Sequence, residues 1–274
     1  MEAWQPYRVT TRNLSVQSEN KIHDDAEARR YGFKGGLVPG TVMYAHMTRP
    51  VVARFGERWL GRNAGEVVLL KPAYEGERLL VTAADAPVGE PCAVKVGLAN
   101  AEGAALAAFD TAIPDALPAP DPLSRMEPDR SGAPRVPIAW ESVIVGKPLR
   151  ALRWEPSAAE HTAWCEGVSD DLPVYRAPHA PLHPGAILQA ANRVFSNHFI
   201  LKPWIHVSSR IVTRGALRVG QSIEVRAQPV ERWEKKGHQI VKLYVAMTAA
   251  GEAVQFNPAV EVWHTAIFTV RPAA

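Results

Sequence analysis

The middle of the chain is dense in proline. Seven of the 24 residues from Pro114 to Pro137 are proline, mixed with aspartate, arginine and serine, and no apolar periodicity crosses them. Because proline fixes φ and removes a backbone donor, such a segment favours extended, polyproline II-like backbone. We therefore expect a linker over residues 114–137. It divides the 274 residues into an N-terminal unit, 1–113, and a C-terminal unit, 138–274.

Three short motifs of the first half recur in the second half in the same order. The pairs are Val38–Thr41 with His183–Ala186, Gly76–Val81 with Gly220–Val225, and Asp110–Ile113 with His264–Ile267, at offsets of 145, 144 and 154 residues. The larger last offset is explained by an insertion in the second half. The shared order favours a tandem duplication of one folding unit.

Each repeat opens with a helical pattern. The clearer one is a buried stripe with spacing i, i+1, i+4, i+7 and i+8, formed by Ile187, Leu188, Ala191, Val194 and Phe195. Pro184 suits the first turn of that helix. Its counterpart begins near Pro39, and Pro50 is expected either to kink it or to start a new helix, because proline removes a donor.

Strand patterns follow the helix in both halves. Apolar runs or alternations bounded by glycine-containing turns cover residues 79–83, 93–98 and 106–113, and then 223–227, 239–247 and 260–270. Each half is thus an α+β unit, in which an antiparallel sheet buries one helix against its apolar face. Two such sheets are expected to pair edge to edge, which protects strand edges that would otherwise be exposed.

The densest polar segment lies next to the first helix. It runs from Ser18 to Asp25 and leads into the turn Gly35–Gly40. It resembles the signature of the MaoC-like (R)-specific enoyl-CoA hydratase/dehydratase family, in which Asp-x-Asn-Pro-x-His-x-Asp precedes Ala, Gly-Phe and an Ile-x-His-Gly turn. The matching residues are Asn20, His23, Asp25, Ala28, Gly32, Phe33 and Gly40.

Three positions depart from that signature. Ser18 stands where the family carries its catalytic aspartate, Lys21 replaces the proline, and Pro39 replaces the histidine before the glycine. The resemblance implies a tandem, or double, hotdog fold. It also implies hydration or dehydration of an enoyl or hydroxyacyl thioester, with CoA as the expected carrier and no cofactor.

Such chemistry needs proton transfer and donors for the thioester oxyanion. His23 is the candidate acid/base, because an imidazole exchanges protons near neutral pH. Glu19 is the nearest substitute for the missing aspartate, and a neighbouring carboxylate is expected to orient His23 or to raise its pKa. The backbone N–H of Gly40 is the candidate oxyanion donor at a helix N-terminus. Asn20 and Asp25 are candidate substrate-binding residues.

A structural interpretation of the same residues stays open. His23 and Asp25 can instead tie down the turn at Asp24, a capping role that polar residues often have. In the second half, Asp171 and His183 form a candidate second site. The alternative there is helix termination by Asp170 and a structural histidine at the start of the next helix.

No metal site is expected. His179 and His183 are four residues apart, but Pro181 between them forbids the helical geometry of a zinc pair, and no other Cys, His or carboxylate cluster has ligand spacing. The acyl-carrier dehydratase branch places an acidic residue five positions after the helix glycine, where this chain has Ala190. His238 and His264 lie in strand patterns and are interpreted as structural. His206 remains a candidate, and Trp204 and Trp154 could line an acyl pocket or cover a helix end.

Composition excludes several classes of partner. The 31 basic and 28 acidic residues are interleaved, with a net charge of +3 and no arginine-rich arm, so nucleic acid is not expected. Apolar runs such as Val67–Leu70 fall short of the roughly 18 residues of a membrane helix, so no membrane partner is expected. Cys92 and Cys165 lie far apart and no signal peptide precedes them, which favours the cytoplasm. A homodimer is left open.

The leading hypothesis is a MaoC-like hydratase or dehydratase acting on an acyl thioester. One alternative is a non-catalytic hotdog protein that binds an acyl ligand or has a structural role, with Ser18 marking the loss of chemistry. Another is an acyl-CoA thioesterase. A fold alone does not separate these three.

Overall fold

The computed structural model describes residues 3–86, 91–250 and 257–271. In the first half the strands are β1 (Tyr7–Thr10), β2 (Asn63–Leu69), β3 (Arg78–Asp85), β4 (Val94–Asn100) and β5 (Ala105–Ala112). In the second half they are β7 (Leu152–Trp154), β9 (Ile205–Thr213), β10 (Ile223–Lys235), β11 (His238–Ala249) and β12 (Val260–Thr269). The short strands β6 (Val136–Pro137) and β8 (Phe199–Ile200) form a separate parallel pair.

Two long helices and several short ones complete the fold. The long helices are α2 (Gly40–Phe55) and α5 (Pro184–His198). The shorter ones are α1 (Asp25–Arg30), α3 (Glu57–Gly61), α4 (Ala158–Gly167) and the 3₁₀ turns η1 (Lys21–His23), η2 (Pro122–Arg125) and η3 (Pro173–Tyr175).

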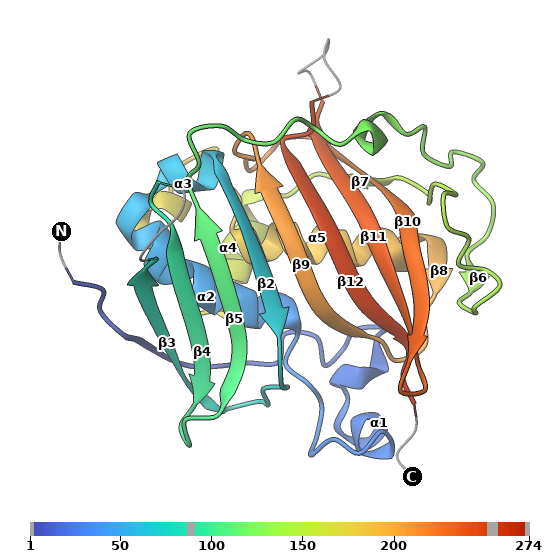
Figure 1. The fold of residues 1–274 in the computed structure, drawn as a ribbon, viewed down its shortest axis with the longest axis horizontal. Coiled ribbons are helices and arrows are strands. Elements are labelled where there is room, and N and C mark those ends of the chain that lie inside the picture. Colours follow the sequence, from blue (N-terminus) through green and yellow to red (C-terminus); the bar gives the residue numbers. More distant parts are fainter. Residues whose placement is uncertain (1–2, 87–90, 251–256, 272–274) are drawn as a thin grey trace.

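Ten strands form one continuous antiparallel sheet in the order β1-β3-β4-β5-β2-β9-β12-β11-β10-β7 (Figure 1). Of the strands in this sheet, each half presents from the centre outward the first one after its long helix, then the fourth, the third and the second, and finally the strand before the helix. The halves meet at the antiparallel pair β2–β9, from Asn63 opposite Thr213 to Val68 opposite Ser208. The two halves therefore have the same topology, as the recurring motifs predict.

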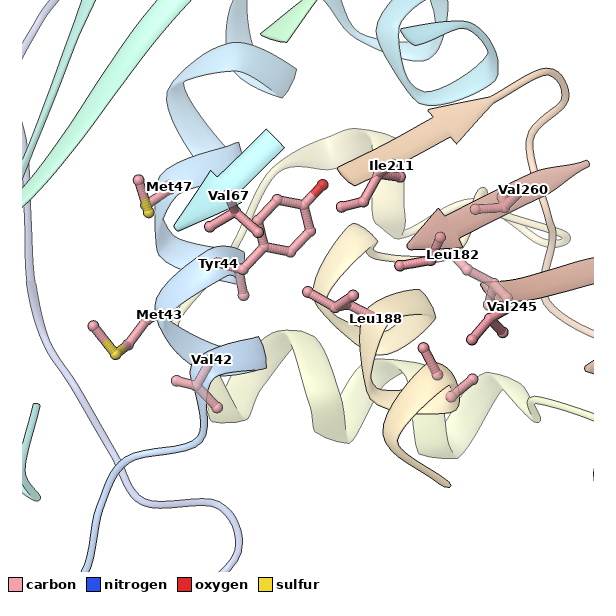
Figure 2. Packing of buried hydrophobic residues seen from close by; sticks show 14 of the residues in the cluster. Val42, Met43, Tyr44, Met47, Val67, Leu182, Leu188, Ile211, Val245 and Val260 are labelled. Carbon is pink, nitrogen blue, oxygen red and sulfur yellow. The ribbon is translucent and has the colours of Figure 1, made fainter. Parts of the chain in front are cut away.

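The long helices lie side by side against one face of the sheet (Figure 1). Tyr44 of α2 and Leu188 of α5 point toward each other between the helices, with Val67 and Ile211 of the central strands nearby (Figure 2). Four of the five residues of the predicted stripe on α5 are at most 1% exposed, and the fifth, Ile187, is partly buried. Burial of this apolar surface is the main stabilising contribution at the centre of the molecule.

Pro50 does not end the first long helix. Helix α2 continues through Pro50 to Phe55, so the expectation of a new helix at that proline is wrong. The next helix, α3, begins after Gly56, whose φ of +55° is readily adopted by glycine. The break therefore lies six residues later than the proline suggests.

The proline-rich segment 114–137 runs from β5 along one end of the sheet, where η2 contacts β11, and then on to β6 (Figure 1). The backbone N–H of Asp121 donates to Glu261 Oε1 at 2.8 Å. Glu261 is fully buried, where it accepts from Tyr244 Oη at 2.7 Å and pairs with Arg214. Met126 packs on Tyr244. The segment, which includes the turn η2, is thus fastened to the sheet.

Candidate active site

A cavity of about 420 Å³ lies at the N-terminal end of α2. Its wall comes from both halves of the chain: the segment around η1 and the start of α2 from the first half, and α5 and the start of β9 from the second. Among the predicted residues, Glu19, Asn20, His23 and Gly40 line it, as does Ser18.

His23 is held by the main chain in one orientation. Its Nδ1 lies 2.6 Å from the carbonyl oxygen of Leu37, which can only accept, so Nδ1 carries the proton. Burial lowers the pKa of His23, and the Leu37 carbonyl opposes that shift. The ring is therefore neutral at pH 7, with a lone pair on Nε2. A pKa raised by neighbouring carboxylates, as expected from the sequence, is not what the structure shows.

Asn20 ties the two halves together next to His23. Its Nδ2 donates to the carbonyl of Trp204 at 2.9 Å, and its Oδ1 accepts from the backbone N–H of Trp204 at 3.1 Å. The same Nδ2 lies 3.3 Å from His23 Nε2. The Asn20 amide is thus used to position Trp204, a cavity-lining residue, and to support His23.

Neither Ser18, which stands at the position of the signature's aspartate, nor its neighbour Glu19 is hydrogen-bonded to His23. The hydroxyl of Ser18 donates to the carbonyl of Asn20 at 3.2 Å. The carboxylate of Glu19 accepts from Arg135 at 2.6 Å, and its side chain is about half exposed (48%). Within the described residues no hydrogen bond joins Glu19 to His23, so the structure does not bring these two predicted partners together.

Asp25 lies outside the cavity. Its Oδ1 accepts from the backbone N–H of Gly36 at 2.8 Å, and Oδ2 pairs with Arg29 at 3.4 Å. Its side chain is 70% exposed. In this position Asp25 shapes the turn that leads to α2, which agrees with the structural interpretation, and it lines no part of the described cavity.

Gly40 places the open end of α2 at the cavity. Pro39 at the N-cap has no side-chain capping bond, and within the described residues the backbone N–H groups of Gly40 and Thr41 have no acceptor. A Cβ atom on Gly40 would lie 2.2 Å from Leu69 Cδ1 and 2.8 Å from His206 Nδ1. Glycine therefore keeps this end accessible, and helix N-termini attract negative charge.

A polar stripe on α5 forms the opposite wall. It consists of residues spaced i, i+3, i+4 and i+7, namely Gln189, Asn192, Arg193 and Ser196. Gln189 accepts from the Thr41 hydroxyl at 2.8 Å, while Asn192 Oδ1 is buried and without a partner among the described residues. These residues were not predicted from the sequence to line the site. A polar stripe of helical period beside the apolar one was the available signal.

The candidate second site is arranged differently from the expectation. Asp171 is exposed and binds Arg49 at 2.5 Å, whereas His183 Nε2 lies 3.2 Å from Asp170 Oδ2. His183 is fully buried, and its Nδ1 accepts from the backbone N–H of Gly185 at 3.0 Å, which caps α5. Both ring nitrogens are therefore occupied. The pairing of Asp171 with His183 is corrected to Asp170 with His183.

The described residues contain no group of three or more His, Cys, Asp or Glu side chains that could hold a metal ion. His179, the other member of the histidine pair, lies with Nδ1 3.4 Å from the carbonyl of Val219. Among the described residues, no helix is long and apolar enough to cross a membrane.

No protein-family model matches the sequence, and no curated protein matches it either. Solved structures do. A protein from Chloroflexus aurantiacus described as a MaoC domain dehydratase is 12% identical, with a TM-score of 0.67 over 99% of this chain and 96% of its own. A double hotdog protein from Mycobacterium tuberculosis is 12% identical, with a TM-score of 0.66 over 97% and 96%.

A third similar structure has a different described activity. It is described as an oleoyl thioesterase from Lactobacillus plantarum and is 10% identical, with a TM-score of 0.55 over 98% of this chain and 96% of its own. At such identities the likeness concerns the fold and leaves the reaction open. The chain has the double hotdog fold that MaoC-like dehydratases share.

Proposed function

We propose that this protein is a hydratase or dehydratase of the MaoC-like kind, acting on an enoyl or 3-hydroxyacyl thioester in the cavity at α2. The observation that carries the proposal is the basic nitrogen of His23, Nε2, which the 2.6 Å contact of Nδ1 with Leu37 leaves unprotonated and which has a single long contact, 3.3 Å to Asn20 Nδ2, in the same cavity as the unpaired N–H of Gly40. A base and an oxyanion donor in one cavity are the minimum that the reaction requires.

His23 alone can balance the protons of hydration. Nε2 takes a proton from water as the water oxygen bonds to C3 of the enoyl group, and the electron pair of the double bond moves to the thioester oxygen. The same Nε2 then returns a proton to C2 as the carbonyl re-forms. His23 starts and ends neutral, as its lowered pKa favours, and dehydration is the reverse sequence.

Gly40 would stabilise the enolate formed between these two steps. Its N–H belongs to the first turn of α2, where unpaired amides and the helix dipole favour a negative oxygen. Two exposed cationic residues of the cavity wall, Lys71 and Arg193, suit the phosphates of a CoA carrier.

One observation favours a binding protein as the second candidate. No carboxylate of the described residues is hydrogen-bonded to His23, because Ser18 replaces the family's aspartate and Glu19 binds Arg135. If a second acid/base group is required for turnover, the cavity would hold an acyl thioester without converting it. A missing acid/base group typically reduces a rate by about 10²–10⁴-fold.

The test is water addition to a panel of enoyl-CoA thioesters of different chain length. We expect measurable hydration by the wild type and a loss of about 10²–10⁴-fold in His23→Ala. Ser18→Asp, which restores the family residue beside His23, serves as the gain-of-function control. A wild type no faster than His23→Ala on every thioester, with activity only in Ser18→Asp, would identify a binding protein. Release of free CoA thiol in the same assay would reveal a thioesterase.

A further inference from the structure

His206 lines the cavity and has an unpaired ring nitrogen. The residue comes from the start of β9, in the opposite half of the chain from His23, and only 6% of it is exposed. Its Nδ1 is buried and has no partner among the described residues. The same atom would lie 2.8 Å from a Cβ on Gly40, so it is next to the open N-terminus of α2. Buried polar atoms without a partner are uncommon in folded proteins and require an explanation.

The other ring nitrogen of His206 belongs to a short hydrogen-bond chain. Nε2 lies 2.9 Å from the hydroxyl of Ser209, and that hydroxyl lies 2.8 Å from Nδ1 of His264. The two imidazoles stack with their centroids 4.2 Å apart. His264 is 1% exposed, and its Nε2 has no partner within the described residues.

The single hydroxyl proton of Ser209 couples the two rings. A hydroxyl can donate to one imidazole while it accepts from the other, so two directions are available when both rings are neutral. In one direction His264 Nδ1–H donates to Ser209, Ser209 donates to His206 Nε2, and His206 carries its proton on Nδ1 toward the cavity. In the opposite direction His206 Nδ1 is a lone pair and His264 Nε2 carries the proton.

The cavity decides between the two directions. Desolvation lowers the pKa of His206 to about 4, against the opposing effect of a Ser208 backbone hydrogen bond, and lowers that of His264 well below its usual value, so both rings are neutral at pH 7. In either direction one buried N–H lacks an acceptor among the described residues, that of His264 Nε2 or that of His206 Nδ1. Of these two residues only His206 lines the cavity, so only its N–H can gain an acceptor there, which favours the direction that places the proton on His206 Nδ1.

We infer that His206 is a second donor for the substrate carbonyl, with its Nδ1–H and the N–H of Gly40 directed at one thioester oxygen. The inference rests on the proposed function for the identity of that oxygen. It adds a binding role for the second half of the chain, in which Ser209 and His264 are positioning residues that keep the proton on Nδ1. A neutral imidazole is an effective donor to a developing enolate, because it adds no positive charge to be desolvated.

The first test measures the tautomer directly and does not depend on turnover. Histidine ¹⁵N resonances of the wild-type protein at pH 7 are recorded by NMR, and the signals of His206 and His264 are assigned with His206→Gln and His264→Gln. We expect both rings to be protonated on Nδ1. A His206 ring protonated on Nε2 would overturn the inference, whether or not the protein hydrates enoyl-CoA.

The second test uses two substitutions that separate the ring nitrogens. In His206→Asn the amide occupies the place of Nδ1, and in His206→Gln it occupies the place of Nε2 and keeps the contact with Ser209. Loss of one oxyanion donor reduces kcat by about 10²–10³-fold. We expect that loss in the Gln variant and a recovery of at least tenfold in the Asn variant, with thermal unfolding measured for both.

A carbonyl probe distinguishes donation from a structural role. A saturated acyl-CoA with a ¹³C-labelled thioester carbonyl is bound to the wild type and to His206→Gln, and its infrared stretch is compared. Donation from His206 predicts a lower stretching frequency in the wild type. Equal frequencies, together with equal kcat in an active wild type, would overturn the inference and leave the proposed function standing. A wild type that neither binds nor hydrates thioesters would refute the proposed function, and the tautomer measurement would still decide for His206.

Discussion

The two long helices begin in the same way but have opposite surroundings. At α2, Gly40 faces the cavity of about 420 Å³ and no side chain caps the helix. At α5, a Cβ on Gly185 would lie 2.8 Å from Ala45 Cβ and 2.9 Å from the carbonyl oxygen of Thr41, so that end is sealed. His183 caps α5 with both ring nitrogens occupied, whereas His206 has one nitrogen free beside Gly40. One helix end thus has space for a ligand beside it, and the other is part of the core.

The residues that precede the two helices also differ in their surroundings. Before α2, Asn20 and His23 line the open cavity. Before α5, Asp170 is buried and lies 3.2 Å from His183, with no cavity beside the pair among those described. An acid and an imidazole near a helix start are therefore insufficient for a site without space beside them.

Replacing the capping histidine of the sealed end should have the largest effect on stability. In His183→Ala, Asp170 stays buried and loses the Nε2–H donor of His183, while Arg49 at 3.7 Å remains its ionic partner. Leaving a buried charged acceptor without its hydrogen-bond donor costs about 3 kcal/mol. We therefore expect the free energy of unfolding in urea to fall by that amount, with the hydration rate of the remaining folded protein retained. A folded His183→Ala protein without any activity would show that the sealed end takes part in the reaction.

Acid should destabilise both ends through their buried histidines. Burial lowers the pKa of His206, at the open end, and of His46, near the sealed end, to about 4 from 6.5. Since the unfolded chain binds protons first, the stability from each group is complete above pH 6.5 and is lost as the pH falls toward 4. By linkage each histidine should account for about 2 kcal/mol of the loss between pH 7 and pH 5.

The measurement is urea unfolding at pH 7 and pH 5 for the wild type, His46→Gln and His206→Gln. Each variant should show a smaller pH dependence than the wild type. If only His46→Gln reduces the pH dependence of stability, the cavity hydrates His206 enough to keep its pKa near the usual value. The two helix ends would then differ more in hydration than their burial suggests.

A methyl group on each glycine tests the packing difference directly. At Gly185 it meets the main chain of α2, and overpacking of that kind costs about 1–3 kcal/mol. At Gly40 its nearest contact is the end of the Leu69 side chain, which can turn away, so we expect a smaller loss of stability and a weaker affinity for thioesters. Thermal unfolding and thioester binding of Gly40→Ala and Gly185→Ala check this. Equal destabilisation would mean that the two ends are packed alike.

The fold was largely predictable, because periodicity and repeats are local signals. The stripe on α5 and the motifs shared by β3 and β10 report burial and turns that depend on neighbouring residues only. At Pro50 the sequence left a kink and a new helix open, because the pattern contains no information on how a helix adjusts around a proline. The strand β9 was not identified, although it carries His206 and joins the halves at β2.

The site was less predictable, since it is built across the two halves. His23 and Gly40 were found through their own segment, and the structure places both at the cavity. The contacts of Asn20 with Trp204 and of Glu19 with Arg135 span 184 and 116 residues, and no local pattern predicts them. The pair of Asp170 with His183 was missed by one residue. Both aspartates contact Arg49, and Asp170 alone of the two also contacts His183, a tertiary arrangement that no local pattern predicts.

Glu19 gives the smallest expected effect and the sharpest test of local sequence reasoning. A carboxylate that served as the acid/base partner of His23 would make Glu19→Gln nearly as slow as His23→Ala, because the two groups would act as one unit. In the structure Glu19 is half exposed and binds Arg135, an ion pair worth less than about 1 kcal/mol. We therefore expect Glu19→Gln to hydrate enoyl-CoA within about threefold of the wild type, a change below 1 kcal/mol in the activation barrier.

Arg135→Gln is the matched control, because it breaks the same ion pair and leaves the carboxylate free to turn toward His23. The measurement is the steady-state hydration rate of both variants. A faster Arg135→Gln together with a slow Glu19→Gln would show that Glu19 reaches His23 during turnover. Two small effects would mean that His23 transfers the protons without Glu19.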